Sequence, residues 1–389
     1  MHLIEVKDPQ TVREFLELPV SLYQDHPNWI RPLDQDLEAV FDREKNPNFR
    51  HGEAIRWVLR DQQNRPIGRV AAFVNEDTKN ASAQPTGGMG FFECINDQAA
   101  AFRLFDACRE WLEERGLEAM DGPINFGERD KWWGLLVEGF TPPNYGMFYH
   151  LPYYRQFFEA YGFREYFQQY TYHRKVGDLL SPKLLERADR ILQDPLYRLA
   201  HAQKADMNKL SADFYEVYRR AWANHAEVSQ ASLPKIRAML GELKPVMEEE
   251  IIWFAYYDGE PVGFFAMLPE LNQIFRHLNG KLDLPGKAKF LWHRWRLRRQ
   301  KQNKKVFGII FGVVPEHQAK GVETALMAGP QQVLLDKGYT DIEMNWIGDF
   351  NPKMMVVLRS IGARICKTHI TYRKLFDETK PFERYPVIR

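Results

Sequence analysis

A chain of 389 residues is too long for one ordinary hydrophobic core, so two domains are expected. The composition is globular, with 44% hydrophobic and 27% charged residues, and a formal net charge of +1 excludes a global attraction to nucleic acid. Three scattered cysteines, Cys94, Cys108 and Cys366, have no CxxC pair and no histidine at ligand spacing, which argues against a metal site. There is no apolar signal-peptide segment and no apolar run long enough to span a membrane, so we expect a cytoplasmic protein.

The chain repeats itself with an offset of 200 residues. Segment 153–176 resembles segment 353–376, and in both a helical pattern ends at glycine before an alternating, β-rich strand. The residues that recur are Pro152, Gly162, Arg164, Thr171 and Tyr172, which return as Pro352, Gly362, Arg364, Thr371 and Tyr372. Segments 57–75 and 253–272 also match, each as a strand, a polar turn and a second strand. The chain is therefore a tandem duplication.

Each copy is expected to run strand, two helices, hairpin, strand, helix, strand, helix, strand. In the second copy we predict strand 197–207, helices 209–224 and 233–248, strands 251–258, 261–268 and 306–314, helix 321–337, strand 340–347, helix 352–361 and strand 363–375. This order predicts a mixed α+β fold in which each copy forms a mostly antiparallel twisted sheet flanked by helices.

Three segments are expected from the repeat. They are a first domain over 1–177, a helical connector over 178–196 and a second domain over 197–389. The first copy carries an insertion at 125–150, and the second copy carries a basic insertion at 276–305.

The stretch "PEHQAKGVETAL" (315–326) leaves the strand that ends at Val313 and Val314 and opens a helix at Gly321. Such a turn gathers free backbone N–H groups at a helix N-terminus, which is an anion site that needs no side-chain charge. Gly321 allows a phosphate to approach the backbone, while Gln318 and Lys320 can donate from the rim. An ordinary strand-to-helix turn stays open as the alternative.

The ordered set Pro315-x-x-Gln318-x-x-Gly321, then an amphipathic helix, a strand, and Asn351 before a helix ending at Gly362, resembles the GNAT superfamily of acyl-CoA-dependent N-acyltransferases. More distantly, the chain is similar to tandem bacterial proteins that include bacterial ceramide synthases. The resemblance implies two GNAT-like units, with acetyl-CoA or a longer acyl-CoA as acyl donor and no metal. The cofactor-binding residues that it implies, together with the turn, are Val313, Val314, Gln318, Lys320, Gly321, Val322 and Asn351.

The chain departs from the GNAT pattern at three places. Glu323 replaces a small residue within one turn of the expected pyrophosphate, and Leu358 and Phe158 stand where many GNAT enzymes have a tyrosine general acid. The first copy goes from strand to helix through "FECINDQAAAFRLF" without a glycine. CoA is therefore expected in the second copy, with the first copy degenerate and shaping the acceptor pocket.

N-acyl transfer needs an amine that loses a proton, a polarised carbonyl and alignment of the two. On the strand "TDIEMNW", Glu343 and Asn345 share one face, so Glu343 is the candidate base and Asn345 the candidate orienting group. In the first insertion, Glu128, Arg129 and Trp133 are candidate substrate contacts. An ordinary solvated strand face and a capped loop are the respective alternatives.

The basic insertion contains a helical stripe. Within 287–305, Ala288, Leu291, Trp292 and Trp295 fall at i, i+3, i+4 and i+7, and nine Lys or Arg occur without an acid. A cationic helix with tryptophan on its apolar side is typical of a membrane interface, so contact with the inner face of the membrane is expected. RNA, an acidic partner helix or a solvated loop are alternatives, and nucleic acid is the less favoured partner.

Together these patterns predict an N-acyltransferase that moves an acyl group from acyl-CoA to a small-molecule or lipid-like amine. Two other classes stay open. One is a Fem-like transferase that uses aminoacyl-tRNA, and the other is a non-catalytic acyl-CoA-binding protein.

Overall fold

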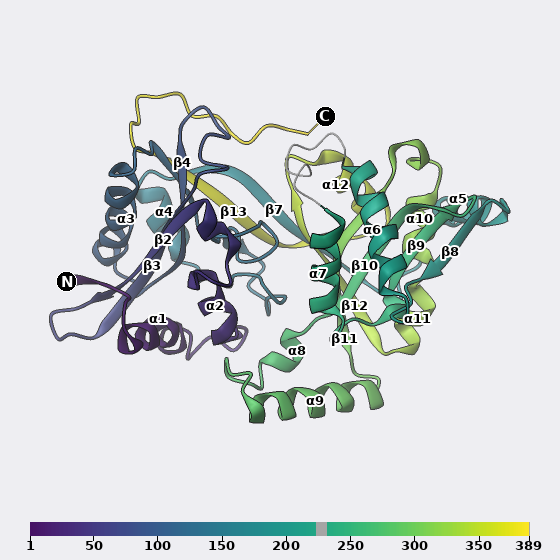
Figure 1. The fold of residues 1–389 in the computed structure, drawn as a ribbon, viewed down its shortest axis with the longest axis horizontal. Helices are drawn as coiled ribbons and strands as arrows, with labels where there is room; N and C mark the ends of the chain where they lie inside the picture. Colours follow the sequence, from purple (N-terminus) through teal and green to yellow (C-terminus); the bar gives the residue numbers. More distant parts are fainter. Residues whose placement is uncertain (223–231, 389) are drawn as a thin grey trace.

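The structure, a computed structural model, describes residues 1–222 and 232–388. One continuous sheet of 13 strands runs through the whole molecule, with helices on its faces (Figure 1). The strand order is β1-β2-β3-β4-β5-β13-β7-β12-β11-β10-β9-β8, and β6 pairs with β13 beside this path. All pairs are antiparallel except β4 with β5 and β11 with β12. The predicted fold class, a mostly antiparallel twisted sheet flanked by helices, is confirmed.

The elements of the first half follow the predicted order. The strands are β1 (His2–Glu5), β2 (Gly52–Arg60), β3 (Pro66–Asn75), β4 (Thr86–Cys94), β5 (Ala119–Gly122), β6 (Leu135–Glu138) and β7 (Arg164–Lys175). The helices are α1 (Pro9–Leu22), α2 (Asp34–Phe41), α3 (Gln98–Glu113), α4 (Tyr154–Ala160) and the connector α5 (Pro182–Gln193), with the short 3₁₀ turn η1 (Pro47–Arg50). Strand β6 belongs to the insertion and has no counterpart in the predicted repeat.

The second half repeats this order. Its strands are β8 (Tyr197–His201), β9 (Ile252–Tyr257), β10 (Glu260–Pro269), β11 (Lys304–Val313), β12 (Tyr339–Gly348) and β13 (Arg364–Leu375). Its helices are α6 (Met207–Ala221), α7 (Leu233–Leu243), α8 (Asn272–Phe275), α9 (Leu284–Arg299), α10 (Val322–Ala328), α11 (Gln331–Asp336) and α12 (Pro352–Ser360), with 3₁₀ turns η3 (Glu249–Ile251) and η4 (Pro315–His317).

Three predicted helices differ from those in the structure. The helix expected over 233–248 ends at Leu243. The helix expected over 321–337 is broken into α10 and α11, because Pro330 has no N–H to continue the ladder and becomes the N-cap of α11. The helix expected over 209–224 ends at Ala221 in the described chain, and 223–224 lie outside the described residues.

The last strands of the two repeats are exchanged. Strand β7 closes the first repeat but pairs with β12, whereas β13 closes the second repeat but pairs with β5. The two strands also pair with each other, and Gln169 lies opposite His369. Since these positions are 200 residues apart, they are equivalent in the repeat, and an approximate two-fold axis passes between them. Two of the predicted recurrences are visible here, because Gly162 and Gly362 both end helices at positive φ (+92° and +81°), and β7 and β13 start at Arg164 and Arg364.

Equivalent strands in the two halves also share a local irregularity. In β4 the pairing with β3 shifts register next to Phe91, which has φ +52°, and in β11 the pairing with β10 shifts around Ile309. The parallel neighbour of each strand pairs with it only over its first part, at 86–88 in β4 and 304–308 in β11. Each half therefore contains a pair of parallel strands that separates after a bulge, and such bulges often lie beside functional sites.

Candidate functional site

The central strands β13, β7 and β12 carry polar side chains on one buried face. These side chains lie together for two reasons. Side chains alternate between the two faces along each strand. The strand pairing also sets Gln169 opposite His369, Thr171 opposite Lys367 and Glu343 opposite His173. We call the following residues the polar face: Gln169, Thr171, Glu343, Asn345, Lys367, His369 and Thr371. Each is at most 6% exposed. Buried polar groups are costly unless they are paired, so their partners decide what this face can do.

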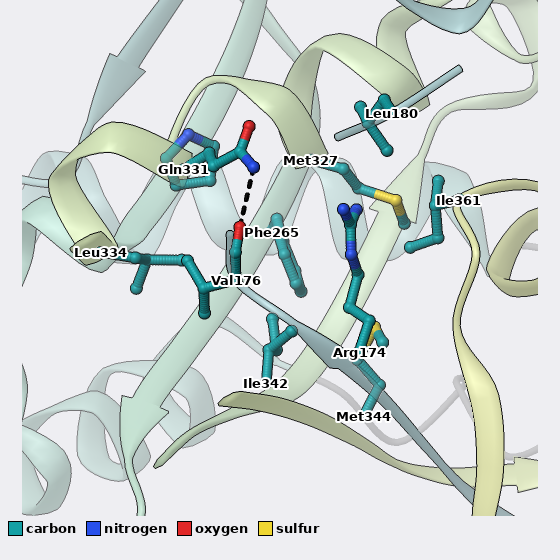
Figure 2. A pocket seen from close by; sticks show the side chains of 11 residues that line it. Arg174, Val176, Leu180, Phe265, Met327, Gln331, Leu334, Ile342, Met344 and Ile361 are labelled. Atoms are coloured by element: carbon teal, nitrogen blue, oxygen red, sulfur yellow. Dashed lines mark hydrogen bonds between the residues drawn. The ribbon is translucent and has the colours of Figure 1, made fainter. Parts of the chain in front are cut away.

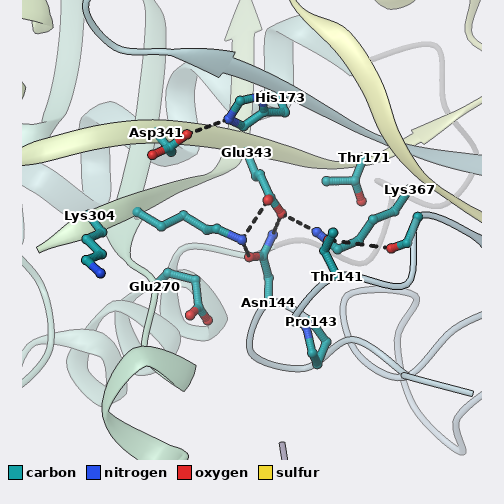
Figure 3. A network of polar contacts seen from close by, with 12 residues as sticks. Thr141, Pro143, Asn144, Thr171, His173, Glu270, Lys304, Asp341, Glu343 and Lys367 are labelled. Carbon is teal, nitrogen blue, oxygen red and sulfur yellow. Dashed lines mark hydrogen bonds and ion pairs between the residues drawn. The ribbon is translucent and has the colours of Figure 1, made fainter. Parts of the chain in front are cut away.

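Glu343 is the centre of a charged network (Figure 3). Its Oε1 lies 2.6 Å from Lys305 Nζ on β11, and its Oε2 lies 2.8 Å from Lys367 Nζ on β13. Asn144 donates its Nδ2 hydrogen to the same Oε2 at 2.8 Å and also bonds Asn345 Oδ1 at 3.0 Å. Glu343 and Asn345, which the sequence places on one face, are therefore joined by a residue of the first insertion.

These contacts determine the proton affinity of Glu343. Burial raises its pKa, but the ammonium groups of Lys367 and Lys305 outweigh burial, so the pKa lies below the ordinary 4.5. Both carboxylate oxygens are also engaged, so neither is free to take a proton from an incoming amine. The structure therefore places Glu343 as the counter-ion of Lys367 and Lys305, and gives less support to its predicted role as the base.

Other atoms of the polar face have no partner in the described part of the chain. They are Asn345 Nδ2, Gln169 Nε2 and Oε1, His369 Nδ1 and Thr371 Oγ1. The Thr171 hydroxyl has only a weak contact, at 3.9 Å, with the sulfur of Met147. Such a concentration of unpaired buried polar atoms is unusual in a protein interior and is typical of a site that receives a ligand or water.

The state of His369 follows from its one hydrogen bond. Its Nε2 lies 3.2 Å from the carbonyl oxygen of Phe148, which can only accept, so Nε2 carries the hydrogen. Nδ1 then has a free lone pair that points into the buried region. Burial is the main cause that lowers the pKa of His369 to about 4, so the ring is neutral at physiological pH.

The first insertion covers the polar face. Gly134 lies so close that a Cβ atom there would be 2.9 Å from His369 Cβ and 3.2 Å from Gln169 Oε1. Phe148 accepts the His369 hydrogen, and Asn144, with 0% exposure, reaches Glu343 and Asn345. Because every side chain of the polar face is buried, a substrate reaches it only when this cover moves.

Asn345 lies at a bulge. The pairing of β12 with β7 shifts register between Met344 and Ile347, and Trp346 has φ +62°, a conformation that is rare for a bulky residue. A bulge changes the direction of a side chain relative to regular pleating. Backbone strain of this kind is concentrated at functional positions, which supports Asn345 as part of the site.

The predicted substrate residues of the first insertion are only partly at this site. Trp133 lies next to Gly134 and its buried Nε1 has no partner among the described residues. Arg129 lies over the Trp133 ring at 5.8 Å, and over the rings of Phe167, Phe350 and Tyr385 at 5.0 to 5.6 Å. Glu128 is exposed to solvent. Arg129 therefore stabilises the contact between the two halves together with Trp133, which directly precedes Gly134 in the chain.

Groups of the protein itself occupy the space inside the turn at 315–322. Glu323 Oε1 accepts the Ala319 N–H at 2.9 Å, which is one of the donors expected to hold a phosphate. Connector α5 packs against the glycine, since a Cβ at Gly321, which has φ +113°, would lie 2.8 Å from the Arg187 carbonyl oxygen. Gln318 uses its Nε2 to bond Val313 O at 2.8 Å. As it stands, this turn does not fit a pyrophosphate beside Gly321.

The other predicted cofactor residues have structural contacts. Val313, Val314 and Val322 are buried in the hydrophobic core, and Lys320 is exposed on the rim. Asn351 caps α12 by accepting the Met354 N–H at 3.1 Å. In the first copy, Asp97 accepts the N–H groups of Ala99 and Ala100, so the equivalent helix start is closed by a carboxylate as well.

An apolar cavity of about 30 Å³ lies on the opposite face of β12 (Figure 2). Ile342 and Met344 line it, and Arg174 extends into it with an Nε that has no partner in the described residues. This volume holds about one water molecule and is far too small for an acyl chain. A larger polar cavity of about 420 Å³ lies near the start of β12, lined by charged residues of both signs that include Glu248, Arg298 and Lys337.

Two further observations concern the whole described chain. No helix among residues 1–222 and 232–388 is long and apolar enough to cross a bilayer. Within the same residues, no group of three or more His, Cys, Asp or Glu side chains could hold a metal ion.

Sequence reasoning did not find Asn144, Gln169, Lys305, Lys367 and His369. A signal was present for three of them, because Gln169 and the pair Lys367 and His369 occur at alternating positions of strands β7 and β13. Lys305 appeared only as one cation of a basic stretch, and Asn144 only as part of a loop.

Comparison with known proteins shows which sequences the chain is similar to. No family model matches the chain. It is 28% identical over 389 residues to the protein of Caulobacter vibrioides (strain NA1000 / CB15N) named "Bacterial ceramide synthase", covering 96% of this chain and 97% of that one. It is also 28% identical over 381 residues to "Protein YghO" of Escherichia coli (strain K12), covering 93% and 92% of the two chains.

Solved structures show the same architecture. A tandem GNAT protein from the clavulanic acid biosynthesis pathway superposes with a TM-score of 0.54 at 13% identity, over 98% of this chain and 99% of that one. A GCN5-related N-acetyltransferase from Sphaerobacter thermophilus superposes with a TM-score of 0.52 at 11% identity, over 98% of each chain. At these identities the match concerns the fold alone. The chain therefore has a tandem GNAT-like fold.

Proposed function

We propose that the protein is an N-acyltransferase that moves an acyl group from acyl-CoA to an amine, and that the polar face receives the acceptor. The observation that carries the proposal is the set of unpaired buried atoms on that face, with a free acceptor at His369 Nδ1 and free donors at Asn345 Nδ2 and Gln169 Nε2. The tandem GNAT-like fold and the name of the Caulobacter relative support the reaction class, and that name favours a lipid-like amine.

His369 is the proposed proton acceptor in place of Glu343, because its Nδ1 has no partner among the described residues, whereas both carboxylate oxygens of Glu343 are engaged. When the amine attacks a thioester carbonyl, its nitrogen becomes positively charged and must lose a proton before the thiol leaves. A neutral imidazole with a free Nδ1 can accept that proton, while Nε2 stays bonded to Phe148 O. The ammonium group of Lys367 adds to the effect of burial in lowering the pKa of His369, so the ring holds the proton only weakly.

Asn345 and Gln169 are the proposed orienting groups. Asn144 holds Asn345 through its Oδ1, so that the Nδ2 hydrogens remain free to bond a carbonyl oxygen. A preorganised donor in a buried site stabilises the developing oxyanion more than it would in water. Gln169 offers both a donor and an acceptor next to His369, which suits an amine that bears a hydroxyl group.

The test is acyl transfer by the purified protein. We expect thiol release from acyl-CoA that depends on an added amine, with acyl-CoA of 2 to 18 carbons supplied against short and long-chain amino alcohols, and an amide product identified by mass spectrometry. CoA binding without turnover over the whole panel would favour the non-catalytic alternative. Transfer from aminoacyl-tRNA instead would favour the Fem-like alternative.

The Gly321 turn leads to a prediction about CoA affinity. Replacing Glu323 with alanine frees the Ala319 N–H and removes a negative charge near the expected pyrophosphate. We expect CoA to bind about fivefold more tightly, close to 1 kcal/mol, as measured by calorimetry.

A matched control is Glu316→Ala, which removes a neighbouring acid that is paired with Arg220 at 3.4 Å and does not contact the Ala319 N–H. The Glu316→Ala variant should bind CoA with the affinity of the wild type. Weaker binding by the Glu323 variant would show that this carboxylate supports the site, and unchanged binding would show that CoA is held elsewhere.

A further inference from the structure

Helix α9 presents an apolar stripe to solvent. Leu284, Leu291, Trp292 and Trp295 are 82%, 64%, 51% and 55% exposed, and the last three follow one face of the helix. In Figure 1 this helix lies at the edge of the molecule, away from the central sheet. Exposed large hydrophobic side chains are ordinary when scattered, but a contiguous stripe that includes two tryptophans marks an interaction surface.

The opposite side of α9 is fixed to the protein. Phe290 packs against Phe275 with ring centroids 5.7 Å apart, and His293 stacks on His277 at 4.2 Å. Arg294 bonds the carbonyls of Pro245 and Val246, and Arg298 pairs with Glu248 at 2.5 Å. These contacts hold the inner side of α9 against the rest of the protein, so that Leu291, Trp292 and Trp295 on its outer side remain exposed to solvent.

The charges on α9 indicate what kind of partner this surface binds. Of the nine Lys and Arg in 287–305, Arg294, Arg298 and Lys305 have the internal contacts described above. Across the described chain, no carboxylate pairs with Lys287, Lys289, Arg296 or Arg299. Arg296 and Arg299 instead lie over the rings of Trp292 and Trp295, at 5.0 and 5.2 Å. Tryptophan and cations on one surface match the boundary between acyl chains and anionic headgroups.

We propose that the outer face of α9 docks the protein on an anionic lipid surface. Leu291, Trp292 and Trp295 enter the boundary between headgroups and acyl chains, while the unpaired cations contact the headgroups. The proposal goes beyond acyl transfer and does not depend on it, because it concerns a surface that shares no residue with the polar face. Docking would also bring the protein to lipid-like amines.

The test is co-sedimentation of the full chain with vesicles of phosphatidylcholine, with and without an equal share of phosphatidylglycerol, at low and moderate salt. We expect binding to the anionic vesicles that weakens with salt. Trp292→Ala/Trp295→Ala should lower the partition constant at least tenfold although every charge is retained. Lys287→Gln/Lys289→Gln should also weaken binding and reduce its salt dependence.

The matched control is Leu192→Ala/Leu196→Ala, which removes two exposed apolar side chains (48% and 44%) from another surface. It should bind as the wild type does, and all variants should keep the wild-type unfolding midpoint. Absence of binding to anionic vesicles, or equal binding by the double tryptophan variant, would overturn the proposal. Displacement of the protein from vesicles by low concentrations of tRNA would also overturn it and assign the surface to nucleic acid.

Discussion

Replacing Glu343 with glutamine is expected to destabilise the fold by about 3–5 kcal/mol at neutral pH, because it leaves buried ammonium groups without a counter-charge. Lys367 is 1% exposed and lies 2.8 Å from Glu343 Oε2, and Lys305 lies 2.6 Å from Oε1. Glutamine has nearly the same shape, so the loss reports charge and not packing. Urea unfolding of the two proteins at pH 7 measures the difference.

The same substitution should change how stability depends on pH. The folded-state pKa of Glu343 is lowered from 4.5, so its contribution is fully present above pH 4.5 and is lost as the pH falls through the folded-state value. The difference between the wild type and Glu343→Gln should therefore be largest at neutral pH and shrink below about pH 4.5. A difference below 1 kcal/mol, or one that is the same at pH 7 and pH 4, would contradict this account.

A double substitution tests whether the lost stability comes from the ion pair or from a general loss of packing. Lys367→Met/Glu343→Gln removes both charges of the more deeply buried pair, so the double variant should be more stable than the sum of the single losses predicts. Lys305, which is partly exposed, remains without its partner. If the two losses simply add, the pair does not act as a unit.

The sequence predicted those parts of the fold that depend on local pattern. Helix stops at Gly162 and Gly362, the strands that follow them and the hairpins of each copy are set by residues that are close together in the chain. The exchange of β7 and β13 could not be predicted in this way. A strand with polar and apolar alternation fits beside either copy, and only the complete sheet decides its neighbours.

The candidate site shows the same limit. Alternation placed Glu343 and Asn345 on one face, and the structure joins them through Asn144. The role of Glu343 depends on Lys305 and Lys367, which lie on two other strands, so its pKa could not be read from its own segment. For Gly321 the local conformation was predicted correctly, because its φ is positive as the turn requires. The space beside it, where a phosphate was expected, is occupied by α5.

Substitution of His369 is expected to have the largest effect on acyl transfer. His369→Gln keeps a polar side chain beside Gln169 but removes the basic Nδ1, so kcat/KM should fall at least 100-fold, about 2.7 kcal/mol in the barrier. Amine-dependent thiol release measures this loss. The unfolding midpoint of the variant should stay close to that of the wild type, because the Phe148 carbonyl can still accept a hydrogen bond from the glutamine amide.

The pH dependence distinguishes this role from a structural one. Burial lowers the pKa of His369 to about 4, so the neutral ring is present throughout the neutral range, and kcat/KM should show the titration of the substrate amine without a second limb near 6.5. The same shift opposes folding in acid, since between pH 6.5 and pH 4 the unfolded chain protonates this ring while the folded protein keeps it neutral. Activity and stability should therefore be lost in different pH ranges.

His150 provides the matched control. It is also a buried histidine, with 1% exposure, but its Nδ1 already accepts the Leu136 N–H at 3.1 Å. His150→Gln should lower the unfolding midpoint while amine-dependent turnover per folded molecule is kept, which is the reverse of the result expected for His369→Gln. If His369→Gln retains full turnover, the proton acceptor is another group, and Glu343 again becomes the first candidate in spite of its lowered pKa.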